Sequence, residues 1–127
     1  MMSKILVVDD AKNILLVLRM SLEKAGYEVI TAMDGITALE KAQDLDPDLI
    51  LLDILLPKMN GFLVFEALKD ETTTAETPVI FISAKAEDED LEKARELGAA
   101  DFLIKPVKQE QLLETVEKYL EGGNENE

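Results

Sequence analysis

LILLDILLPKMNG, residues 49–61, contains the pattern from which the fold is predicted. It opens on four consecutive apolar residues, Leu49–Leu52, changes to an acid at Asp53, and passes through Pro57 to Gly61, where a helical pattern begins. A short unbroken apolar run is typical of a strand covered on both faces, as the strands of parallel sheets are. The stretch therefore predicts a buried strand that ends at Asp53 and leads through a turn into a helix.

The same alternation extends over the whole chain. Further apolar runs that predict strands occupy Ile5–Val8, Val29–Ala32, Val79–Ile82 and Phe102–Ile104. Segments of helical period between and after the strands predict helices over Ile36–Gln43, Gly61–Lys69, Glu87–Leu97 and Val107–Leu120, besides one before residue 26. Strands that alternate with helices indicate repeated βα units, so we expect an α/β fold with about five parallel strands.

The first predicted helix has a clear apolar stripe. Ile14, Leu18, Leu22 and Ala25 are three or four residues apart, which places them on one stripe that we expect to face the sheet. Gly26 is placed to end this helix, because glycine adopts the left-handed backbone conformation that often follows a helix.

Length and composition narrow the range of functions. The 127 residues suit one domain, which we expect over residues 1–121, with the polar residues 122–127 as a flexible tail or the start of a linker. There are 27 acidic residues against 13 basic ones, a net charge of −14, so direct binding to nucleic acid or an anionic membrane is not expected.

The chain contains no Cys and no His, which excludes disulfides, thiol chemistry and the usual zinc ligands. No apolar stretch approaches the ~20 residues of a membrane span, and the first residues lack a signal-peptide pattern. We therefore expect a cytoplasmic protein.

Chemically useful side chains stand at the ends of the predicted strands. Asp9 and Asp10 follow the first strand, Asp53 the third, Ser83 the fourth and Lys105 the fifth. In an open parallel sheet, ligands bind beyond the carboxyl ends of the strands, so these side chains can share one cleft.

Three carboxylates at short range repel one another unless a cation neutralises them, and Mg²⁺ prefers such oxygen ligands. A lysine and a hydroxyl can hold phosphoryl oxygens, and an Asp carboxylate can act as the nucleophile.

Four segments in order resemble the response regulator receiver family: VVDD (residues 7–10), DILLPKMNG (53–61), ISAK (82–85) and GAADFLIKPV (98–107). The resemblance extends from Lys4 to Leu120. It implies a CheY-like, flavodoxin-like doubly wound (βα)5 domain of two-component signalling, with strand order 2-1-3-4-5 and helices on both faces of the sheet. It also implies a cis peptide between Lys105 and Pro106.

The resemblance implies a role for each candidate residue. Asp53 would accept the phosphoryl group. Mg²⁺, or Mn²⁺ in its place, would be held directly by Asp10, mainly through water by Asp9, and also by Asp53 and the backbone carbonyl of Leu55. Ser83 and Lys105 would contact the phosphoryl group. Ser83 and Phe102 would form the conformational switch, and Leu55 and Lys85 would tune the lifetime of the phosphorylated state.

By the same resemblance, the donor would be a sensor histidine kinase or a phosphotransfer protein. An output protein would bind the face formed by the fourth helix, fifth strand and fifth helix. The chain would be a monomer or a phosphorylation-dependent dimer, and it would catalyse only its own phosphorylation and dephosphorylation rather than turn over an external substrate.

Other interpretations stay open at this stage. Taken singly, Asp53 could be a helix cap, Ser83 a loop hydroxyl, Lys105 an ordinary strand-end residue and Phe102 a simple core residue. Two further classes are a receiver-like adaptor with a silent site and a flavin-binding electron carrier of the same topology. The acidic loop that follows Asp9 argues against a flavin phosphate, which needs a hydroxyl-rich or glycine-rich loop there.

Overall fold

The structure, a computed structural model, describes residues 2–84 and 87–120. The five strands are β1 (Lys4–Val8), β2 (Glu28–Ala32), β3 (Leu49–Leu52), β4 (Val79–Ser83) and β5 (Asp101–Ile104). The five helices are α1 (Lys12–Lys24), α2 (Gly35–Leu45), α3 (Gly61–Asp70), α4 (Asp88–Leu97) and α5 (Gln109–Leu120). Lys85 and the residues 122–127 that we expect to form a tail or linker lie outside the described residues.

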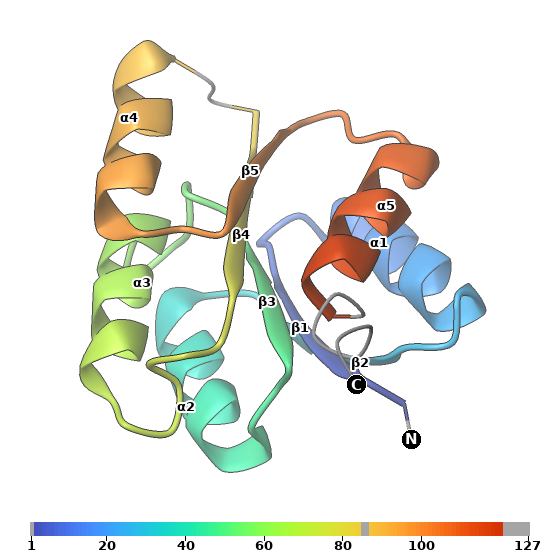
Figure 1. The fold of residues 1–127 in the computed structure, drawn as a ribbon, viewed down its shortest axis with the longest axis horizontal. Coiled ribbons are helices and arrows are strands. Elements are labelled where there is room, and N and C mark those ends of the chain that lie inside the picture. Colours follow the sequence, from blue (N-terminus) through green and yellow to red (C-terminus); the bar gives the residue numbers. More distant parts are fainter. Residues whose placement is uncertain (1, 85–86, 121–127) are drawn as a thin grey trace.

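All neighbouring strands pair in parallel, and the sheet order is β2-β1-β3-β4-β5. Helices α1 and α5 cover one face of the sheet, and α2, α3 and α4 cover the other (Figure 1). Each face has its own apolar core, because successive strand residues point to opposite sides. The α/β fold, the strand order and the two helical layers that the sequence predicts are confirmed.

The first helix departs from its predicted stripe. Leu18 and Leu22 are buried as expected, and Ile14 is partly buried. The prediction that Ala25 faces the sheet is wrong: α1 ends at Lys24, so Ala25 lies in the following turn and is exposed, while Leu15 faces the core in α1.

Boundaries elsewhere differ by one or two residues from the prediction. Strand β5 begins at Asp101 rather than Phe102, because Asp101 still pairs with Ile80 of β4. Helix α2 begins one residue earlier and ends two residues later than expected. Asp34 caps its start: the Asp34 carboxylate accepts a hydrogen bond from the Thr37 backbone N–H at 2.8 Å. In the described part of the chain, no helix is long and apolar enough to span a membrane.

Candidate functional site

Two acids come together at the carboxyl edge of the sheet because β1 and β3 are neighbours in register. Val8 pairs with Leu52, and the residue after each is an aspartate. The ladder continues one residue further: the Asp53 N–H donates to the Val8 carbonyl, and the Asp9 N–H donates to the Ala32 carbonyl, both at 3.1 Å. Backbone pairing alone therefore places both carboxyl groups at one edge.

The acidic cluster consists of Asp9, Asp10 and Asp53. One carboxylate oxygen from each lies within 4.8 Å of the others. Asp9 and Asp53 are buried, with 1% and 5% of their surface exposed, whereas Asp10 is exposed. Buried carboxylates this close together need a cation, since each charge raises the cost of the other.

Lys105 supplies positive charge within the cluster. It follows β5, and its Nζ lies 2.6 Å from Asp9 Oδ2 and 2.8 Å from Asp53 Oδ2. Its backbone N–H donates to the Ser83 carbonyl at 2.9 Å, which fixes the base of the side chain. The ammonium group thus bridges two acids that are far apart in the sequence.

The ion pairs and burial also shift the pKa values of Asp53 and Lys105. Burial raises the pKa of Asp53; the bond to Lys105 opposes this, and the Asp9 charge raises it further. Burial acts to lower the pKa of Lys105, but the two carboxylates outweigh burial and the pKa rises.

Backbone amides orient both buried carboxylates. Asp9 Oδ1 accepts a hydrogen bond from the Ala11 N–H at 2.9 Å, and Asp53 Oδ1 accepts one from the Leu55 N–H at 3.2 Å. In each case the second oxygen faces Lys105. The orientation of Asp53 therefore depends on the position of the loop that carries Leu55.

The donor set fits a hard divalent cation. Three carboxylates offer oxygen ligands only, which is the chemistry that Mg²⁺ and Mn²⁺ accept. The exposed Asp10 lets the cluster meet solvent, so the site can be reached from outside.

The remaining predicted residues surround this cluster. Ser83 is fully buried at the end of β4, beside β5, and Leu55 is exposed in the loop after Asp53. Phe102 is partly buried, and its ring centroid lies 6.2 Å from that of Phe81 in the core. Phe102 therefore belongs in part to the core, as the plainer interpretation expected. The Lys105-Pro106 peptide is cis.

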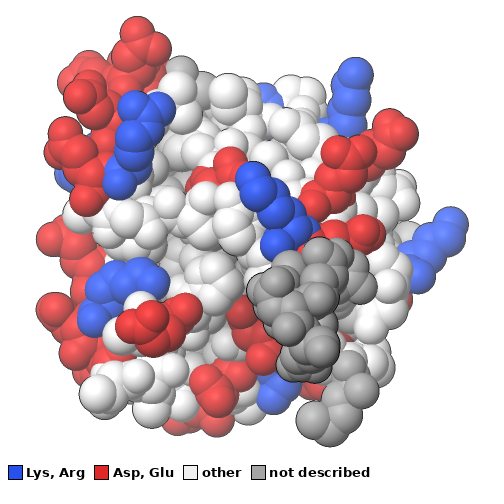
Figure 2. All heavy atoms as spheres, viewed as in Figure 1, with Lys and Arg blue, Asp and Glu red and all other residues white. Residues whose placement is uncertain are grey.

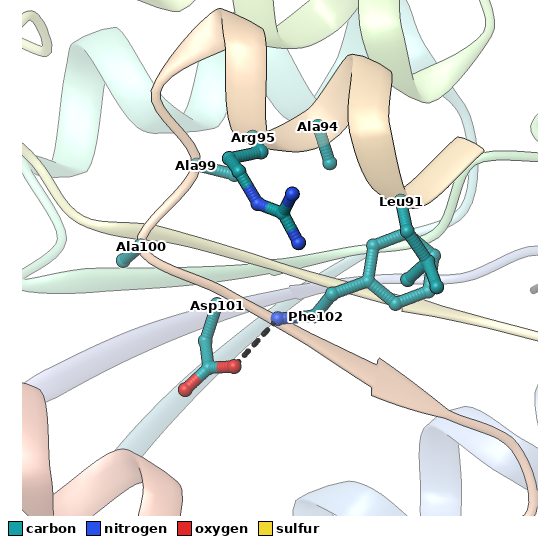
Figure 3. Close-up of a pocket in the computed structure, with 7 residues that line it drawn as sticks. All are labelled: Leu91, Ala94, Arg95, Ala99, Ala100, Asp101 and Phe102. Atoms are coloured by element: carbon teal, nitrogen blue, oxygen red, sulfur yellow. Dashed lines mark hydrogen bonds between the residues drawn. The ribbon is translucent and has the colours of Figure 1, made fainter. Parts of the chain in front are cut away.

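Phe102 also lines a hollow of about 260 Å³ between α4 and β5. Figure 3 shows its ring below Leu91 of α4, with Arg95 on the same side and Asp101 directed away. The Phe102 side chain thus lies at the edge of the core, beside the hollow between α4 and β5.

Close packing of two glycines was not foreseen from the sequence. A methyl group on Gly61 would run into the Asp53 carbonyl, and one on Gly35 would lie 2.6 Å from the Met59 carbonyl. Gly61 is the last residue of the segment 49–61, and a glycine at the start of a helix could have indicated a close backbone contact. Gly35 carries no comparable signal, because its contact forms between distant segments.

The family and structural comparisons agree with this geometry. The model of the response regulator receiver domain matches residues 5–117. The protein PilH of Pseudomonas aeruginosa is 36% identical over 121 residues, which cover 95% of this chain and 100% of PilH. PhoP of Bacillus subtilis, a transcriptional regulatory protein of alkaline phosphatase synthesis, is 45% identical over 84% of this chain and 43% of its own length. The chain thus spans under half the length of this relative.

Solved structures show the same fold. The chemotaxis response regulator CheY4 of Vibrio cholerae aligns with a TM-score of 0.90 and 36% identity, over 94% of this chain and 100% of that one. The receiver domain of a Pseudomonas aeruginosa sensor histidine kinase, solved with a magnesium ion coordinated in its active site cleft, aligns with a TM-score of 0.87 and 28% identity. That alignment covers 94% of this chain and 98% of the other. These matches leave the flavin-carrier alternative without support.

Proposed function

The chain belongs to the response regulator receiver family of two-component signalling, a domain type without turnover on an external substrate, and we propose that Asp53 is its phosphoacceptor. One observation carries the proposal: the Lys105 ammonium bridges Asp9 and Asp53, with Asp10 in the same cluster. A capping or surface role for these acids does not explain why a partly buried lysine joins them.

Magnesium would be held by Asp9, Asp10, Asp53 and the backbone carbonyl of Leu55. When bound, the ion neutralises the acids and shields an incoming phosphoryl group from their charge. The protein's own contribution is to hold these oxygens together, which the parallel ladder and the backbone amides do.

The transfer step needs little from the protein beyond position and charge. A carboxylate oxygen of Asp53 forms the new bond to phosphorus, while the bond between phosphorus and the donor's leaving group breaks and that group departs with the electron pair. Lys105 would pair with one phosphoryl oxygen, and the Ser83 hydroxyl would donate a hydrogen bond to another. The Asp53 carboxylate attacks in its ionised form, so the step needs no general base.

The conformational response would pass through Ser83 and Phe102. The new dianion on Asp53 would draw the Ser83 hydroxyl toward it and favour inward packing of the Phe102 ring. The face of α4, β5 and α5 would then shift between two states, which changes its affinity for an output protein. The hollow beside Phe102 supports this proposal, because it adjoins the ring that has to move.

The donor would be a sensor histidine kinase or a phosphotransfer protein.

Acidic side chains crowd the side of the molecule where α4 lies (Figure 2). The exposed acids there are Glu87, Asp88, Glu89, Glu92 and Glu96. This charge favours a protein partner over nucleic acid. The domain would act as a monomer or as a dimer formed on phosphorylation.

Intact-mass spectrometry tests the assignment of Asp53. We expect wild type, incubated with acetyl phosphate and Mg²⁺, to gain the mass of one phosphoryl group, and Asp53→Ala to gain none. Asp44→Ala, which removes an exposed acid of α2, should behave as wild type does. A phosphorylated Asp53→Ala would place the acceptor elsewhere, and an unmodified wild type would refute the proposed function.

A further inference from the structure

The loop between β3 and α3, residues 53–60, controls the orientation of the phosphoacceptor carboxylate. Its Leu55 N–H donates to Asp53 Oδ1 at 3.2 Å. Its two ends are tied together, because the Gly61 N–H donates to the Ile54 carbonyl at 2.8 Å. A displacement of this loop that moves Leu55 therefore changes a hydrogen bond that orients Asp53.

The middle of the loop rests on the beginning of α2. The Gly35 N–H donates to the Pro57 carbonyl at 3.5 Å, and the Lys58 ammonium lies 3.7 Å from Asp34 Oδ2. Asp34 also caps α2 through Thr37, which holds the end of that helix in place.

The contact is close only because residue 35 has no side chain. A Cβ at Gly35 would lie 2.6 Å from the Met59 carbonyl oxygen, 2.7 Å from Met59 Cβ and 2.8 Å from a methyl carbon of Val64. Real side chains do not approach so closely, and the nearest atom belongs to the backbone, so either the loop or α2 must move to admit a methyl group.

We propose that Gly35 is a positioning residue for phosphorylation: it lets α2 seat the Pro57–Met59 segment, and this seating sets the loop that orients Asp53. The inference rests on the proposed function of Asp53. Gly35 touches neither the acids nor Lys105 in the contacts described above, so it acts through the loop and not on the reacting atoms.

Gly35→Ala tests the inference. We expect its initial rate of phosphorylation by acetyl phosphate, followed by intact mass at saturating Mg²⁺, to fall about tenfold, because small misplacements of reacting groups are costly. In metal-free protein, the ¹H–¹⁵N NMR signal of the Leu55 amide should also shift, since this amide bonds to Asp53.

Gly26→Ala is the matched control for stability. Gly26 has a φ of +100° and open space around its Cβ position, so alanine there strains the backbone without touching the loop. It should lower the urea midpoint while leaving the phosphorylation rate of the folded protein and the Leu55 signal unchanged. A second variant, Met59→Gly, keeps the carbonyl but removes the Met59 side chain, whose Cβ packs against Gly35, and it loosens the backbone of the seated segment without adding a clash. It should also slow phosphorylation.

The outcomes are distinct. An unmodified wild type refutes the proposed function of Asp53, and the inference with it. A second outcome refutes the positioning role of Gly35 alone. In that outcome the wild type is phosphorylated, while the Gly35→Ala variant folds, reacts at the wild-type rate and shows an unshifted Leu55 signal. If Gly35→Ala does not fold, a wild-type rate in Met59→Gly refutes it in the same way.

Discussion

Replacing Lys105 by Met should lower the free energy of unfolding by about 3 kcal/mol in buffer without divalent cations. The amine lies 2.6 Å from Asp9 and 2.8 Å from Asp53, and both carboxylates are almost fully buried. Methionine has a similar length but no charge, so two buried acids would lose their cation. Urea unfolding in the presence of EDTA measures the loss.

Lys108→Met is the control for this change, because Lys108 is exposed three residues further along the chain. A surface lysine contributes little to stability, so we expect its unfolding midpoint to stay near that of wild type. Equal stabilities for Lys105→Met and Lys108→Met would mean that Lys105 does not neutralise the acidic cluster.

Phe81→Ala should reduce the free energy of unfolding by about 4 kcal/mol, a large part of a typical domain's stability. Phe81 is fully buried in β4, and its ring lies 5.2 Å from Phe62, 5.7 Å from Phe65 and 6.2 Å from Phe102, centroid to centroid. Truncation would leave a cavity between α3 and β5. The neighbouring aromatic rings could fill this cavity only if α3 or β5 moved. Urea unfolding monitored by circular dichroism provides the measurement.

Phe81→Leu separates the effect of the cavity from the loss of an aromatic ring. Leucine retains much of the volume, so we expect this variant to lose only about 1 kcal/mol. Similar, small losses for both substitutions would show that the rings around Phe81 are loosely packed.

The acidic site was predictable because it follows from one geometric rule. Residues that come directly after parallel strands meet at one edge, and the apolar runs marked where those strands end. Asp9 and Asp53 meet because β1 and β3 are in register, and Lys105 reaches them from β5. The strand order itself came from the resemblance to a family, since apolar runs do not state which strands are neighbours.

Features that depend on tertiary contact could not be predicted in this way. Ala25 matched a helical period but lies beyond the end of α1, because periodicity does not mark where a helix stops. The close approach of Gly35 to the Met59 carbonyl joins segments more than twenty residues apart and leaves no periodic signal. Lys69 is another such case: its amine donates to the carbonyls of Ala75 and Thr77 and so ties α3 to the turn before β4.

A magnesium titration of folding stability tests whether Asp9, Asp10 and Asp53 form one divalent-cation site. The free energy of unfolding of wild type, measured in urea at constant ionic strength, should rise with Mg²⁺ and gain about 2.7 kcal/mol at a hundred times the dissociation constant. Asp10→Asn, which removes one negative charge from the cluster but leaves both Lys105 ion pairs, should gain less at every concentration. A wild-type stability that does not change across the titration would contradict a cation site at this cluster and favour a receiver-like adaptor with a silent site.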